Sequence, residues 1–66
     1  MKKNYRVFYS SPKREVVYEI EPSLKKRGKF LVTRNASFDD QVYMTKWEAE
    51  DFVRDLKASG WIEAEL

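Results

Sequence analysis

The stretch that decides the fold, residues 45–61, has the sequence TKWEAEDFVRDLKASGW. It opens with a capping box, because the Thr45 hydroxyl can accept from the Glu48 backbone N–H while the Glu48 carboxylate reaches back to the Thr45 N–H. Apolar residues then recur at the period of one helix face, as Ala49, Phe52, Val53 and Leu56. Gly60 can end the helix in a left-handed conformation, after which Trp61 can fold back on Leu56. One amphipathic helix is therefore predicted between Thr45 and Gly60.

Upstream of the helix, four segments have the residue types or the alternation typical of strands. They are residues 4–10, 15–21, 29–34 and 41–44. The connections between them are short, so an antiparallel meander is expected, with residues 35–40 as a loop. The tail at 62–66 alternates apolar and acidic side chains and is either a short C-terminal strand or a loose end. The sequence predicts a single α+β domain over residues 1–66, in which an antiparallel meander of three or four strands packs on one C-terminal helix.

Side-chain alternation divides the predicted sheet into two faces. The face expected against the helix carries Tyr5, Val7, Tyr9, Val16, Tyr18, Ile20, Phe30, Val32, Val42 and Met44. The opposite face is expected to carry Phe8, Val17, Leu31 and Tyr43, surrounded by Arg6, Glu15, Glu19, Lys29 and Thr33. Three interpretations of this second apolar stripe stay open: a nucleic-acid surface, a surface for a protein partner or a second copy, and internal cover by the tail or a loop.

Composition excludes several kinds of chemistry. The 66 residues include no His and no Cys, which removes Ser-His-Asp and Cys-His catalysis, disulfides and zinc-thiolate sites. Asp39 and Asp40 form an acidic pair in a loop, but no further ligand follows at the spacing of a calcium-binding loop. We therefore expect a protein that is not an enzyme, with no catalytic residue, no metal or other cofactor, and no small-molecule substrate.

Short apolar runs and the lack of cysteine bear on location. The longest apolar runs, at 7–9 and 30–32, have three residues, whereas a membrane-spanning helix needs about 20. No apolar segment of a secretory signal follows the charged start of the chain. A chain without Cys also fits a reducing compartment. These features predict a cytoplasmic protein that does not contact a membrane.

Positive charge is concentrated in the first half of the chain. Residues 1–34 contain ten Lys or Arg and three acidic residues, whereas residues 35–66 contain three and eight. Within residues 25–29 only Gly28 is not a cation, and glycine permits a tight turn there. A basic loop of this kind can bind a phosphate backbone, although charged loops can equally be solvated, and the two halves can neutralise each other in the fold.

Two binding hypotheses follow from these features. The first is a non-enzymatic nucleic-acid-binding domain in which cations contact phosphates and aromatic rings stack on bases. Its candidate residues are Arg6, Phe8, Lys25, Lys26, Arg27, Lys29, Arg34 and Tyr43. The alternative is a protein-binding adaptor or inhibitor of the phage or mobile-element type, or a homodimer, that uses Val17 and Leu31 on the second sheet face or Trp47 as an apolar anchor.

The predicted strands followed by YMTKWEAEDF at residues 43–52 resemble the amino-terminal arm-binding domains of phage and transposon integrases. In that family a three-stranded sheet packs on one helix, and a Thr-x-x-Glu-Ala-x-x-Phe type segment opens the helix. The resemblance covers roughly a third of the chain, and this sequence departs from the family by its predicted fourth strand. It implies DNA binding through the sheet and assigns no individual contact.

Overall fold

The computed structural model describes residues 5–10, 13 and 15–65. In chain order its elements are β1 (Arg6–Tyr9), β2 (Val17–Pro22), β3 (Lys29–Arg34), the 3₁₀ helix η1 (Phe38–Asp40), β4 (Gln41–Thr45), α1 (Lys46–Ala58) and β5 (Ile62–Glu63). Asn4 and Leu66, at the ends of the first and last predicted segments, lie outside the described residues. The strands form one antiparallel sheet in the order β4-β3-β2-β1-β5. The predicted α+β class and meander are confirmed, and the tail adds the short fifth strand.

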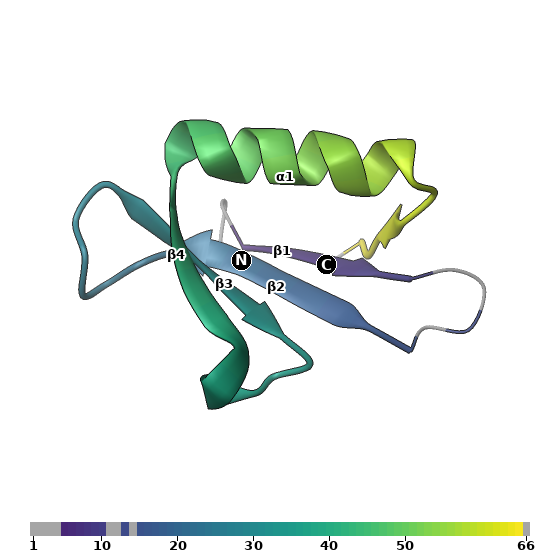
Figure 1. Ribbon diagram of the computed structural model, residues 1–66, viewed down its shortest axis with the longest axis horizontal. Helices are drawn as coiled ribbons and strands as arrows, with labels where there is room; N and C mark the ends of the chain where they lie inside the picture. The colour runs from purple at the N-terminus through teal and green to yellow at the C-terminus, as the bar shows by residue number, and fades with distance from the viewer. Residues whose placement is uncertain (1–4, 11–12, 14, 66) are drawn as a thin grey trace.

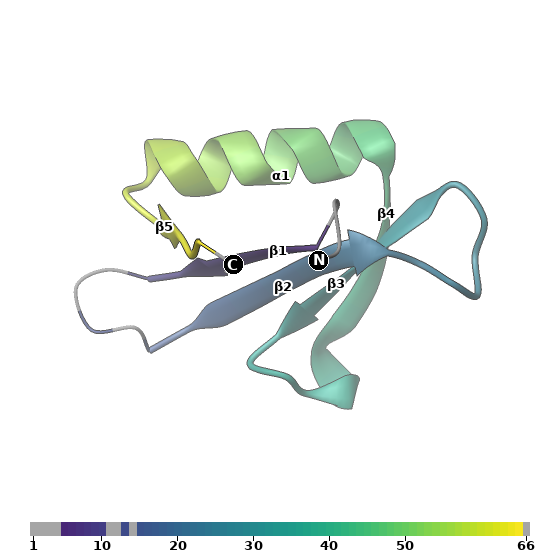
Figure 2. The ribbon, with the colours of Figure 1, turned by 180° about the vertical axis from the view of Figure 1, so that it is seen from behind.

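The helix lies along one face of the sheet and leaves the other face without a covering helix (Figure 1). The reverse view shows the same two layers, with the β2–β3 loop at one end of the molecule (Figure 2). We call the side that faces α1 the covered face and the other side the open face. No helix in the described part of the chain is long and apolar enough to cross a membrane.

Both predicted helix ends are confirmed. The Thr45 hydroxyl accepts from the Glu48 N–H (3.1 Å), and the Thr45 N–H donates to Glu48 Oε1 (2.8 Å), which completes the capping box. At the other end Gly60 has a φ of +88°, and the Trp61 N–H donates to the Leu56 carbonyl (3.0 Å). This pair of features is the Schellman arrangement, which turns Trp61 back toward the core.

The core fills the space between the covered face and the helix. Its most buried members are Phe8, Ile20, Val32, Val53 and Leu56, and Tyr18, Phe30, Met44, Phe52 and Trp61 pack against them. The Tyr18 ring meets Phe52 edge-on with centroids 4.9 Å apart and lies 5.4 Å from Trp61. The predicted core positions on β2 and β3 are thus confirmed.

The face assignment of β1 is corrected. Phe8 pairs with Tyr18 and is fully buried beneath the helix, so it belongs to the covered face. Strand alternation then places its neighbours on the open face, including Val7, which pairs with Glu19. The members of this misassigned set are Tyr5, Val7 and Tyr9.

The reason for this error is that both alternating sets of β1 contain aromatic residues. Tyr5, Val7 and Tyr9 form a set of three apolar side chains, whereas the other set contains the charged Arg6 beside Phe8. The first set therefore indicated the core more strongly. In the structure, Arg6 sits near the sheet edge and bonds Glu63 of β5, so a cation is tolerated on the covered face. The Tyr5 hydroxyl donates to Glu19 on the open face (3.2 Å).

Two further differences concern the ends of the sheet. Val42 pairs with Val32, but β4 is an edge strand and Val42 remains 51% exposed, so it is not a core residue. The tail does not cover the open face. Instead, β5 pairs with the edge of β1, and Trp61 packs on the covered side. The described elements therefore leave the open face uncovered.

Candidate nucleic-acid interface

The loop between β2 and β3 brings the basic segment to one end of the sheet. The Ser23 N–H donates to the Lys29 carbonyl (2.9 Å), and its hydroxyl accepts from the N–H groups of Lys25 (3.2 Å) and Lys26 (2.9 Å). The Lys29 N–H donates to the Lys26 carbonyl (3.1 Å), and Gly28 adopts a φ of +78°. These bonds hold the loop backbone, so its side chains project from a defined turn.

Four cations gather on this turn, and we call them the basic tip: Lys25, Lys26, Arg27 and Lys29. The first three are exposed and Lys29 is half-buried. The salt bridges found in the described part of the chain use Arg6, Arg54 and Lys57, and none involves the basic tip. Its charge is therefore available to an external anion.

Tyr43 lies beside the basic tip on the open face. It pairs with Leu31 and is 39% exposed, and Lys26 Nζ stands 4.6 Å from the centroid of its ring. This cation–π contact holds the Lys26 ammonium over the end of the open face. In this arrangement Tyr43 positions a cation.

Two of the predicted nucleic-acid residues, Phe8 and Arg6, lie on the covered face. Phe8 is in the core and cannot stack on a base while the protein is folded, so its predicted role is corrected. Arg6 donates Nε and Nη2 to the two carboxylate oxygens of Glu63, both at 2.7 Å. This bidentate bond raises the pKa of Arg6 and lowers that of Glu63. Glu63 thus neutralises the Arg6 charge.

Arg34 lies at the opposite end of β3 from the basic tip. The two ends are roughly 17 Å apart at the usual rise of an antiparallel strand. Arg34 is exposed, and it lines a hollow together with Asp39 and Asp40. The structure therefore groups four of the predicted cations with Tyr43 and leaves Arg34 apart, near acidic residues.

Acidic side chains occupy the middle of the open face. Glu19 and Glu21 flank the buried Ile20 on β2 and point away from the helix. Burial raises the pKa of Tyr5, and the charge of Glu19 and its hydrogen bond raise it further. Carboxylates repel phosphate, so the open face as a whole does not favour a nucleic-acid backbone. Among the described residues of the open face, the basic tip favours phosphate contact.

An apolar groove on the open face was not predicted. It has a volume of about 290 Å³ and is lined by Leu31 and Tyr43, together with Leu24 of the basic loop and Phe38 of η1. Leu24 is fully exposed and Phe38 is 87% exposed. Each is a single apolar residue within a polar turn, so no periodic pattern in the sequence indicates a groove here.

Among the alternative partner-binding residues, Trp47 is the most exposed. Its exposed fraction is 73%, and Lys46 Nζ lies 5.9 Å from the ring. Val17 and Leu31 lie on the open face as predicted, half-buried by their neighbours in the sheet. The structure thus presents one apolar anchor on the helix start and a partly apolar open face.

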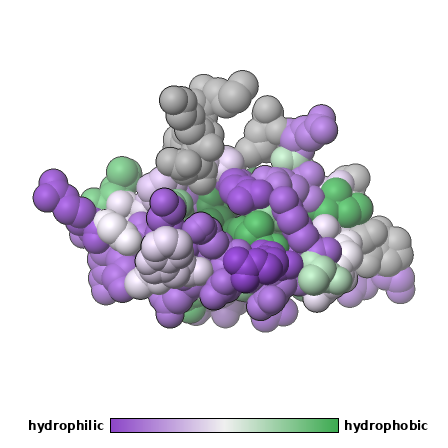
Figure 3. Space-filling view, turned by 90° about the horizontal axis from the view of Figure 1, so that it is seen from above, coloured by the Kyte–Doolittle hydropathy of each residue, from purple (hydrophilic) through white to green (hydrophobic). Residues whose placement is uncertain are grey.

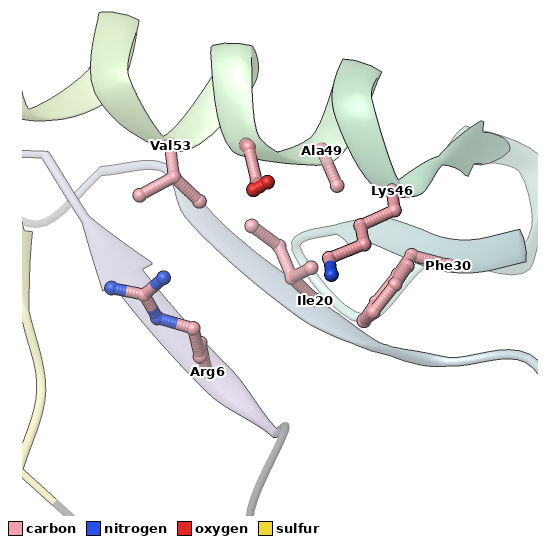
Figure 4. Close-up of a pocket in the computed structure, with 7 residues that line it drawn as sticks. Arg6, Ile20, Phe30, Lys46, Ala49 and Val53 are labelled. Carbon is pink, nitrogen blue, oxygen red and sulfur yellow. The ribbon is translucent and has the colours of Figure 1, made fainter.

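A second hollow, of about 190 Å³, lies between the first half of α1 and the sheet (Figure 4). Ile20 and Phe30 line it from the sheet, and Ala49 leaves it open because its side chain is small. Lys46 and Arg6 reach it from two sides, but Arg6 is paired with Glu63. Within the described residues, no three acidic side chains come together to hold a metal ion.

The helix side of the molecule carries charges of both signs. Its surface is mainly hydrophilic (Figure 3), and the exposed acids of the helix are Glu48, Glu50, Asp51 and Asp55. Hydrogen bonds from the Thr45 backbone and side chain lower the pKa of Glu48. Among the described residues, cations are therefore most concentrated at one end of the sheet, whereas the helix carries four exposed acids beside the exposed cations Lys46, Arg54 and Lys57.

The chain matches no protein-family model, no curated protein and no solved structure.

Proposed function

We propose that this protein is a small non-enzymatic domain that binds nucleic acid through the basic tip. The observation that carries the proposal is the set of four cations that form no salt bridge in the described structure and stand on a hydrogen-bonded turn. Clustered lysine and arginine side chains bind phosphates and release counterions from the nucleic acid. The helix carries three cations and four acids, so it has no excess of positive charge to compete with the basic tip for phosphates.

Binding of this kind is independent of base sequence and depends strongly on salt. Four phosphate contacts give a slope of log K against log salt of roughly −3 to −4 for duplex DNA. Affinity should then fall on the order of 100-fold between 50 and 200 mM salt. Tyr43 contributes by holding Lys26 in place.

The test is fluorescence anisotropy with a labelled 20-nucleotide single strand and the matching duplex, measured over a salt series. The variant Lys25→Ala/Lys26→Ala/Arg27→Ala should lose most of the affinity and flatten the slope by about one unit for each cation removed. The matched control, Arg34→Ala/Arg54→Ala/Lys57→Ala, removes the same charge far from the tip and should bind nearly as well as the wild type. No binding at 20 mM salt, or equal losses in the two variants, would contradict the proposal.

A second candidate function, protein binding, is favoured by a different observation. Large exposed apolar side chains occur repeatedly between residues 38 and 47, and Trp47 is prominent among them. Exposed apolar patches of this kind mark interfaces. Trp47→Ala should then weaken protein association and leave the affinity for the oligonucleotide unchanged.

A further inference from the structure

We propose that β4 pairs with β4 of a second copy of this chain, in antiparallel register centred on Tyr43. This inference rests on the protein-binding candidate and names its partner, whereas nucleic-acid binding by the basic tip does not depend on it.

The outer side of β4 carries unpaired backbone groups. The Ser23 N–H bonds the Lys29 carbonyl and the Asn35 N–H bonds the Val17 carbonyl, so the odd-numbered residues of β3 bond to β2. Ladder bonds alternate in direction along a strand, so the even-numbered residues of β3 bond to β4. Their partners are Val42 and Met44. The N–H and C=O groups of Gln41 and Tyr43 therefore point outward.

The β4 edge lacks the devices that keep sheet edges apart. The strand QVYMT has no charged residue and no proline, and it contains Val, Tyr and Thr, which favour strands. At the other edge β5 has only two residues, and one of them is Glu63. A short charged edge resists pairing, whereas the β4 edge is open to another strand.

Exposed apolar side chains are concentrated along this edge. Six large apolar side chains are exposed in the described part of the chain, and four of them belong to β4 or its immediate flanks. These four are Phe38, Val42, Tyr43 and Trp47. Strand pairing along β4 would bring Val42 and Tyr43 into one interface, with main-chain bonds for affinity and side chains for specificity.

The charges at the two ends of β4 identify the occupant as a second copy. Acidic Asp39 and Asp40 precede the strand, and Lys46 follows it. In an antiparallel pair centred on Tyr43, Asp40 of one copy lies next to Lys46 of the other, and this contact occurs twice because the interface is two-fold symmetric. The edge is thus complementary to itself in charge.

Backbone pairing is also consistent in this register. Tyr43 faces Tyr43 of the second copy, so the two residues exchange both of their hydrogen bonds. The Gln41 N–H faces the Thr45 carbonyl of the second copy. The Thr45 N–H is already bonded to Glu48 Oε1, so the Gln41 carbonyl of the second copy stays with solvent and four main-chain bonds join the two strands. The two Tyr43 side chains lie side by side on the open face, a favourable cross-strand aromatic pair.

The test is sedimentation equilibrium of the full chain from 1 µM to 1 mM with charge variants of exposed residues, which leave the core intact. Lys46→Glu alone and Asp40→Lys alone should each raise the dimer dissociation constant at least about tenfold, because each places like charges at both symmetric contacts. An equimolar mixture of the two variants should dimerise like the wild type, because the heterodimer restores opposite charges at both contacts. Arg54→Glu, an exposed charge reversal away from β4, is the control and should have no effect.

A second variant tests the backbone. Tyr43→Pro removes an outward N–H and should give a folded monomer, because proline is tolerated where an edge strand faces solvent. The inference would be overturned if the wild-type protein remained monomeric over the whole concentration range. It would also be overturned if the wild type dimerised and neither charge variant weakened the dimer. Recovery of the dimer in the mixture of the two charge variants supports the inference. This result does not depend on whether Tyr43→Pro folds.

Discussion

The covered face and the open face of the sheet are built from the same four long strands, yet they have different tasks. Ile20 and Val32 are each 2% exposed beneath the helix, whereas Glu19 and Leu31, one residue earlier, lie on the open face and remain in contact with solvent. A single step along a strand thus changes a side chain from core to surface. The covered face stabilises the fold, and the open face with its β4 edge and basic tip remains available for binding.

The largest effect is expected at Phe8, which tests the corrected face assignment of β1. Phe8→Ala should cost about 3–5 kcal/mol through lost burial and a cavity. A domain of this size has a stability of roughly 3–5 kcal/mol, so the variant should be largely unfolded at 25 °C. Val7→Ala, on the open face, should cost no more than about 1.5 kcal/mol. Urea denaturation followed by circular dichroism measures both, and equal losses would show that the two faces of β1 are equally buried in solution.

A pair of serine substitutions on β3 sharpens the comparison. Val32→Ser should cost about 2–4 kcal/mol, because it removes a buried side chain and leaves a hydroxyl in the core. Leu31→Ser should cost about 1 kcal/mol, since Leu31 is already in contact with water. Thermal melts at low protein concentration separate the two. If Leu31→Ser unfolds the protein as completely as Val32→Ser, the open face is covered in solution.

A smaller effect is expected where the helix is anchored over the covered face. Thr45→Ala removes the acceptor for the Glu48 N–H and should cost about 1 kcal/mol. In a domain this small that corresponds to a decrease in melting temperature of roughly 4–8 °C. Thr45→Ser retains the hydroxyl and should melt close to the wild type. A variant Thr45→Ala with an unchanged melting temperature would mean that the cap contributes nothing to stability.

The smallest effect is a dependence of stability on pH at the edge of the covered face. The hydrogen bond from Arg6 lowers the pKa of Glu63 below its ordinary value of 4.5. The stability that the ionised Glu63 contributes through this bond is therefore complete above pH 4.5 and is lost as the pH falls through the lowered pKa. The melting temperatures of wild type and Glu63→Gln, compared from pH 7 to pH 3, should converge as the pH falls. A constant difference would show that Glu63 acts through packing and not through its charge.

Much of the candidate site could be predicted, but not its boundaries. The basic tip was visible as four cations around Gly28, because a charged turn between strands is a local feature. The assignment of Arg6 to the same surface could not be checked from the sequence, since its partner Glu63 is 57 positions away. Leu24 and Phe38 were missed because an isolated apolar residue in a turn has no period.

The sequence by itself determined the helix, both of its caps, the strand segments and the α+β class. These depend on contacts between near neighbours, such as Thr45 with Glu48 and Trp61 with Leu56, and on alternation within single strands. Only the tertiary structure decided which face of β1 is buried, which strand forms the open edge, and which cations stand together. Those outcomes depend on strand order and on long-range partners, because a side chain is buried by whatever packs against it and not by its own position in the pattern.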